Sequence, residues 1–280
     1  MKDFILSSVG RLDLTVWMLV IIFFCGSALL FQGNVQMAFI GSGGIIFEML
    51  LIGISIEIII EILKTTKGIG TITGFITNGP EAVCLIVGLL VGDIIFASST
   101  PLGSNFMNPI LLICAAIASG QMFVLLHTHR KYTILTVILT AATALIFFTL
   151  PRHYYIVWVF AAVLISVLLF LRRPAEPQHH QETNQTTESK FWLLPATGVL
   201  TIAGYFLDPV VTFAAHHSHA PKGVIGFVVL ATLTSWPEFK SSLALLNRNR
   251  HAAAILNITV SNITNIWLAA GGIIVYLFSR

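Results

Sequence analysis

Long apolar segments, each about as long as a bilayer is thick, are the feature that most constrains this chain. A helix needs about 20 apolar residues to cross the hydrocarbon layer. Of the 280 residues 56% are hydrophobic and 10% are charged, whereas soluble domains carry about a quarter charged residues. The sequence therefore predicts an all-α integral membrane protein and argues against a soluble domain. Nine spans are expected, at residues 12–31, 37–63, 69–90, 100–120, 132–150, 154–171, 191–213, 222–246 and 251–278.

Lys and Arg residues gather in the connections on one side of these nine segments. Because cytoplasmic loops are enriched in Lys and Arg, this bias predicts a multi-pass protein of the inner or plasma membrane. The N-terminus is then cytoplasmic and the C-terminus outside, and the polar stretch 172–190 is a cytoplasmic linker. The expected cytoplasmic residues are Lys2, Arg11, Lys64, Lys67, Arg130, Lys131, Arg172, Arg173, Lys190, Arg248 and Arg250, against Arg152, Lys222 and Arg280 outside.

Two short motifs each occur twice in the chain, and their copies are 157 positions apart. "TNGPE" with "GSNFMN" corresponds to "TSWPE" with "VSNITN", and in each half the Ser lies 23 positions after the Glu. Chance is a poor explanation of equal spacing in both halves, so we infer an internal repeat. Segment 69–90 starts on the cytoplasmic side and 222–246 on the outer side, so the halves are inverted. Inverted repeats build many secondary transporters, with a binding site near the bilayer midplane.

Each repeat places a Pro-Glu pair, Pro80-Glu81 and Pro237-Glu238, deep in an apolar segment. A carboxylate at this depth costs about 3 kcal/mol, so such residues are functional by default. Proline removes a helical hydrogen bond and frees backbone oxygens. Two carboxylates brought together would repel unless a cation or proton lay between them. Carboxylate, carbonyl, hydroxyl and amide oxygens are ligands of hard cations such as Ca²⁺.

The polar residues of the second motif occur four positions apart, as Ser104 with Asn108 and Ser261 with Asn265. This spacing puts each pair on one helix face, which can meet the Glu of the neighbouring helix. Asn105 and Asn262 are expected to face elsewhere. Hydrogen bonding between helices is the simpler alternative role for these side chains.

With these motifs the chain resembles the calcium/cation antiporter superfamily, and most closely the sodium/calcium exchangers of prokaryotic type. The resemblance implies an antiporter, not an enzyme, that exchanges Ca²⁺ for Na⁺ by alternating access, with helices 37–63 and 191–213 as the mobile pair. Its partners are then the lipid bilayer and inorganic cations, without nucleic acid or a resident cofactor. The implied ion ligands are Glu81, Glu238, Thr77, Asn78, Thr234, Ser235, Ser104, Asn108, Ser261 and Asn265, with backbone carbonyls of Gly74 and Ala231 at the sodium sites.

The expected organisation is an extra N-terminal helix in 1–36, a five-helix first repeat in 37–171, the linker 172–190 and a three-helix second repeat in 191–280. The family commonly has five helices in each repeat, so the second repeat is short. Asn78 and Asn265 differ from the family pattern. Lys240, two positions after Glu238, is expected to point away from the Glu and reach toward the cytoplasm, or to turn inward and replace the calcium ion.

Other functions stay open on the sequence alone. A proton-coupled exchanger and a divergent member without exchange activity fit the same motifs. An intramembrane metalloenzyme using "HHSH" at 216–219 is disfavoured, because no nucleophile or base lies at matched depth. Glu48 is a further candidate, as part of an ion pathway.

Overall fold

A computed structural model describes residues 9–92, 94–177, 188–220 and 231–279 of the chain. Every regular element in these ranges is a helix, which confirms the predicted all-α fold. Seven stretches of the described residues are long and apolar enough to cross a membrane, so the count of nine spans stays a prediction. They are Arg11–Leu30, Ile69–Leu90, Ala97–Ala118, Arg130–Thr149, Arg152–Leu171, Leu193–Ser218 and His251–Phe278.

The long helices lie close to the predicted segments, with breaks and short additions that the apolar pattern does not indicate. Segment 69–90 forms two helices, and the part of 222–246 before residue 231 lies outside the described residues. The order is α2 (Arg11–Leu30), α3 (Val35–Leu63), α4 (Ile69–Ile76), α5 (Gly79–Val91), α6 (Ile94–Ala118), α7 (Met122–His127), α8 (Arg130–Thr149), η1 (Arg152–Tyr154), α9 (Tyr155–Leu171), α10 (Glu188–Phe191), α11 (Leu193–Ser218), α13 (Ala231–Thr234), α14 (Trp236–Asn247) and α15 (His251–Phe278).

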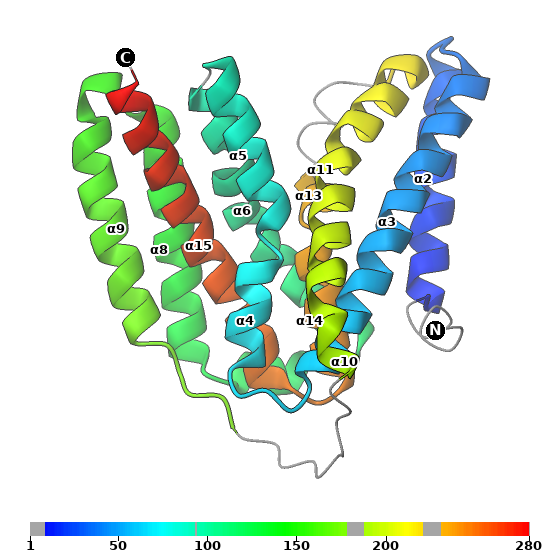
Figure 1. Cartoon of the computed structure of the whole chain (residues 1–280). Coiled ribbons are helices and arrows are strands. Elements are labelled where there is room, and N and C mark those ends of the chain that lie inside the picture. Colours follow the sequence, from blue (N-terminus) through cyan, green and yellow to red (C-terminus); the bar gives the residue numbers. More distant parts are fainter. Residues whose placement is uncertain (1–8, 93, 178–187, 221–230, 280) are drawn as a thin grey trace.

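The helices form a bundle with the broken helices in its middle (Figure 1). On one side α2, α3 and α11 lie together, and on the other α8, α9 and α15 do, with α4–α6 and α13–α14 between them. The α3–α11 packing is close, because a Cβ on Gly41 of α3 would lie 2.7 Å from the Cβ of Ala214 on α11. The two outer groups therefore hold the broken helices between them.

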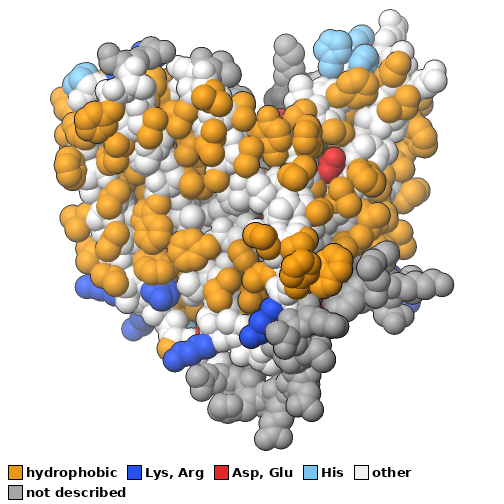
Figure 2. Space-filling model, in the orientation of Figure 1, with side chains coloured by type: hydrophobic (Ala, Val, Ile, Leu, Met, Phe, Trp, Pro, Cys, Tyr) orange, Lys and Arg blue, Asp and Glu red, His pale blue; other side chains and the backbone are white. Residues whose placement is uncertain are grey.

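The surface is apolar around the bundle and basic at one end. Hydrophobic side chains cover the face seen in Figure 2, and the Lys and Arg side chains gather at its lower end. Large apolar side chains such as Leu90 and Leu194 are more than 80% exposed, as expected of helices that face lipid. We call the basic face the end formed by the α3–α4, α7–α8 and α14–α15 turns. The helix α2 begins at this end and α15 finishes at the other (Figure 1); which end is cytoplasmic stays a prediction.

Candidate functional site

Both Pro-Glu pairs lie directly after a break between two helices. The first break separates α4 from α5 at residues 77–78, and the second separates α13 from α14 at residue 235. Pro80 and Pro237 are each in the first turn of the helix that follows. Proline is tolerated there because the N–H that it lacks has no partner within the helix. The chain is thus interrupted at equivalent positions of the two halves.

The two glutamates occupy equivalent positions, as the third residue of α5 and of α14. Glu81 is 1% exposed and Glu238 is fully buried. The positive end of a helix dipole favours a carboxylate in the first helical turn. Each break therefore presents a buried acidic group to the middle of the bundle.

Each glutamate contacts the serine of its own repeat. Ser104 Oγ lies 3.3 Å from Glu81 Oε1, and Ser261 Oγ lies 3.3 Å from Glu238 Oε1. The second carboxylate oxygen of each glutamate, Oε2, has no hydrogen-bond partner among the residues that the structure describes. The 23-residue spacing in the sequence thus corresponds to the same contact in both halves.

Side chains of α15 join the two halves through amide hydrogen bonds. Asn78, at the start of α5, donates from Nδ2 to the Ser261 carbonyl (2.9 Å) and accepts from Ser261 Oγ at Oδ1 (2.7 Å). Asn108 of α6 donates to Ser261 Oγ at 3.1 Å. Asn265 donates to Asn105 Oδ1 at 3.2 Å. Polar side chains from both repeats therefore meet in one buried network.

Three further expected ligands lie in the breaks or directly beside them. Thr77 is fully buried, and its hydroxyl lies near the Glu238 carboxylate without meeting hydrogen-bond geometry. Ser235, also fully buried, has no hydrogen-bond partner for its Oγ among the described residues. Thr234 ends α13, directly before the second break.

The two expected backbone positions differ in what surrounds them. Gly74 lies one turn before the first break, where α4 crosses α15. A Cβ on Gly74 would lie 2.6 Å from the Asn257 carbonyl oxygen, so only glycine permits this approach. Ala231 begins α13. Tight packing thus brings α4 against the helix that carries Ser261.

Two other predicted groups lie away from this network. Glu48 is half-buried on α3 and has no hydrogen bond or ion pair with the described residues. His216 and His217 lie in the last turn of α11 and not in a loop. The described part of the chain holds no cluster of three or more His, Cys, Asp or Glu side chains that could bind a metal ion.

Two asparagines that we expected to face elsewhere belong to the buried network. Asn262 accepts from Asn108 Nδ2 at 3.0 Å and donates to the Asn105 carbonyl at 3.3 Å. That expectation was wrong, because α6 and α15 cross closely enough for adjacent positions to reach the same interface. Asn257 was missed entirely: it is fully buried and donates to Ser241 at 2.7 Å. An amide inside an apolar segment was its only sequence signal.

Lys240 neither reaches solvent nor enters the glutamate site, so both expectations for it need correction. It is 6% exposed, and its Nζ lies 2.9 and 3.0 Å from the two Asp13 carboxylate oxygens. Asp13 is in the first turn of α2. This helix therefore supplies the counter-charge for a cation buried two residues after Glu238.

Of the ten buried side-chain oxygens without a hydrogen-bond partner among the described residues, six belong to predicted ligands. Buried polar atoms are nearly always paired, so unpaired ones need an explanation. These six atoms are Thr77 Oγ1, Glu81 Oε2, Asn108 Oδ1, Ser235 Oγ, Glu238 Oε2 and Asn265 Oδ1. Oxygens of these types are the ligands that Ca²⁺ takes in sets of about six to eight. The donor set therefore fits a hard cation.

Comparisons with known proteins agree with this chemistry. The family described as sodium/calcium exchanger protein matches residues 191–278, which include α11 and α13–α15. The inner membrane protein YrbG of Escherichia coli (strain K12) is 26% identical over 217 residues, covering 72% of this chain. The chain spans 66% of the length of that relative. No solved structure matches the chain significantly. In its buried, paired Pro-Glu breaks and in these two matches, this membrane protein is similar to sodium/calcium exchangers.

Proposed function

We propose that this chain is a secondary active cation antiporter that exchanges Ca²⁺ for Na⁺ by alternating access. The observation that carries the proposal is that six buried oxygens of the predicted ligands, those of Glu81 and Glu238 included, have no hydrogen-bond partner among the described residues. The family match supports cation antiport in general. The Ca²⁺ ion is the cargo, and the two carboxylates bind it together with the hydroxyl and amide oxygens of the breaks and of α6 and α15.

Charge neutralisation gives a physical reason for exchange. Two buried carboxylates without a cation would leave negative charge in a medium where charge is costly. One Ca²⁺ or two Na⁺ ions would neutralise Glu81 and Glu238 equally. We therefore infer that the pair α3 and α11 moves past the central helices only with the site filled. Transport of Ca²⁺ in one direction is then coupled to transport of Na⁺ in the other.

The test is transport by purified protein in liposomes. An outward Na⁺ gradient should drive uptake of labelled calcium, and an equal K⁺ gradient should not. Calcium uptake that is equal with and without an opposing ion gradient would refute exchange. Glu61→Gln serves as a matched control, because Glu61 lies on the basic face and pairs with Lys64.

Proton coupling is the second candidate, supported by the same two carboxylates. A carboxylate buried beside another acid can be neutralised by a proton as well as by a metal ion. If a pH gradient drives calcium uptake and a Na⁺ gradient does not, the coupling ion is H⁺. The non-exchanging alternative loses support from Lys240, because that cation pairs with Asp13 and does not fill the glutamate site.

A further inference from the structure

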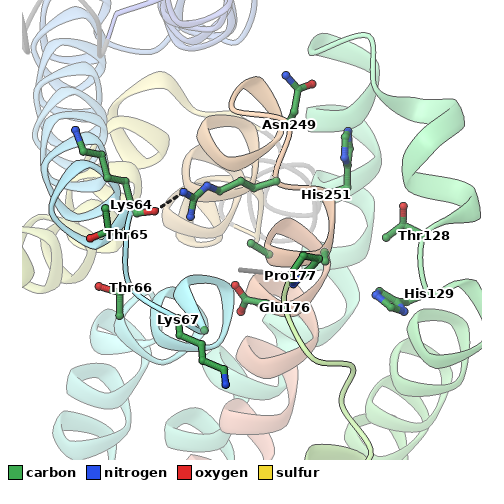
Figure 3. A pocket seen from close by; sticks show the side chains of 14 residues that line it. Lys64, Thr65, Thr66, Lys67, Thr128, His129, Glu176, Pro177, Asn249 and His251 are labelled. Atoms are coloured by element: carbon green, nitrogen blue, oxygen red, sulfur yellow. Dashed lines mark hydrogen bonds between the residues drawn. The ribbon is translucent and has the colours of Figure 1, made fainter. Parts of the chain in front are cut away.

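A cavity of about 400 Å³ opens on the basic face, away from the glutamate site. Its walls come from the α3–α4 turn, the α7–α8 turn, the α14–α15 turn and the start of the α9–α10 linker. Figure 3 shows Lys64, Lys67, His129 and His251 around it, with Glu176 entering from the linker. Arg250 also lines it. Its volume is enough for a small phosphorylated molecule or headgroup.

Positive charge dominates the lining. Lys64, Lys67 and Arg250 have basic side chains, whereas Glu176 is the only carboxylate among the described residues that line the cavity. Lys64 is partly neutralised by Glu61, and the Arg250 guanidinium donates to the Lys64 carbonyl. Lys67 is exposed and has no hydrogen bond or ion pair within the described ranges. A concave site lined by one sign of charge concentrates ions of the opposite sign.

The Glu176 carboxylate shows how an oxyanion is held at this cavity. Its Oε1 accepts from the backbone N–H of Gly70 (3.0 Å) and of Thr71 (3.2 Å), and its Oε2 lies 3.2 Å from Gly70 N. These donors belong to the first turn of α4, more than 100 residues from Glu176 in the sequence. The Glu176 carboxylate thus occupies one edge of the cavity. The three basic side chains there carry more positive charge than this one carboxylate can neutralise.

We propose that this cavity binds a phosphate-bearing anion, held by Lys67, Lys64 and Arg250, which takes the place of the Glu176 carboxylate at the start of α4. A phosphate carries more charge and more acceptor oxygens than a carboxylate, and Arg and Lys bind it through charge-assisted hydrogen bonds. The source is either a soluble phosphorylated molecule or the headgroup of an anionic lipid. This inference does not rest on ion exchange.

The cavity is also placed to affect the glutamate site. The helices α4 and α15 both begin at it, and a Cβ on Gly70 would lie 2.2 Å from the Ala253 carbonyl oxygen. The two helix starts are therefore in direct backbone contact. The helix α4 leads to the first break, and α15 carries Ser261. A ligand at the starts of these two helices therefore contacts both helices that position the Glu81 and Glu238 site.

Calorimetric titration of the purified full chain with inorganic pyrophosphate, at constant ionic strength, tests the soluble source. Titration of the chain in nanodiscs with and without phosphatidic acid tests the lipid source. Lys67→Gln should weaken binding about tenfold, the loss expected for one charge-assisted hydrogen bond. Glu176→Gln should strengthen it, because the phosphate then displaces a neutral amide, and not a carboxylate, from the Gly70 and Thr71 N–H groups. Lys131→Gln is the matched control, because Lys131 is an exposed lysine that does not line the cavity.

Each outcome decides for or against the site. Saturable binding in either arm, weakened by Lys67→Gln and strengthened by Glu176→Gln, supports it and identifies the source. No saturable binding in both arms would overturn it. Equal weakening by Lys67→Gln and Lys131→Gln would also overturn it, because the effect would then be general surface charge.

Discussion

The buried pair of Asp13 and Lys240 joins α2 to α14, the helix that carries Glu238. The side chains are 8% and 7% exposed, so both charges have left water. At an effective dielectric constant of about 20, charges 2.9 Å apart attract by about 6 kcal/mol. Desolvation offsets much of this attraction, but removal of one partner leaves a buried charge and typically costs about 3–5 kcal/mol. Asp13→Asn should therefore lower the free energy of unfolding by that amount.

A double-mutant cycle separates this charge effect from lost packing. Denaturant titration in mild detergent, followed by tryptophan fluorescence, would compare Asp13→Asn, Lys240→Gln and the double variant. The double variant removes both charges, so it should lose much less stability than the two single losses added together. Calcium affinity should also fall in Asp13→Asn. In that variant the positive charge of Lys240, two residues after Glu238, is no longer neutralised by Asp13. Additive losses, or a loss under about 1 kcal/mol in Asp13→Asn, would refute the reasoning.

Three further predictions concern the helix crossing, the network and the linker. Gly74→Ala should lower the free energy of unfolding by about 1–3 kcal/mol in the same titration, because the new Cβ would lie 2.6 Å from the Asn257 carbonyl oxygen. Gly43→Ala is the control and should cause no such loss, because the space around Gly43 is open. Ser261→Ala should weaken calcium binding, measured by calorimetry, about tenfold, since Ser261 contacts Glu238 and Asn78. Ser279 is exposed at the end of the same helix, so the control Ser279→Ala should leave calcium binding unchanged. Burial raises the pKa of Glu176 above its usual value, against the opposing effect of the Gly70 and Thr71 N–H groups. The folded chain then holds that proton more tightly than the unfolded chain, so stability should fall as the pH rises from about 4.5 through the raised pKa. Glu176→Gln should lack this decline, and an unchanged slope in that variant would contradict the assignment.

The sequence predicts the helices and the repeated motifs well, because both depend on local patterns. Apolar length locates α2, α3 and α15 within a few residues, and the 157-residue repeat indicates two equivalent Pro-Glu breaks. The position of the glutamates in the first turn of α5 and α14 follows from the preference of proline for that turn.

Contacts between distant segments are what the sequence does not indicate. Asp13 and Lys240 are 227 residues apart, and Glu176 and Gly70 are 106 apart. No periodic pattern pairs such residues, since their partner depends on how the helices cross. Asn105 and Asn262 show the same limit, because helical spacing alone assigns them to another face. Tertiary packing of α6 against α15 places them in the network.

The central claim is that Glu81 and Glu238 form one cation site from two inverted halves. The most direct measurement is labelled-calcium uptake by the reconstituted protein under a Na⁺ gradient, in the original chain, Glu81→Gln, Glu238→Gln and the control Glu61→Gln. We expect each site variant to lose about a hundredfold in uptake rate, since each removes one of the two charges that balance the ion, while the control keeps its rate. Uptake that persists in either site variant at the rate of the control would contradict the account.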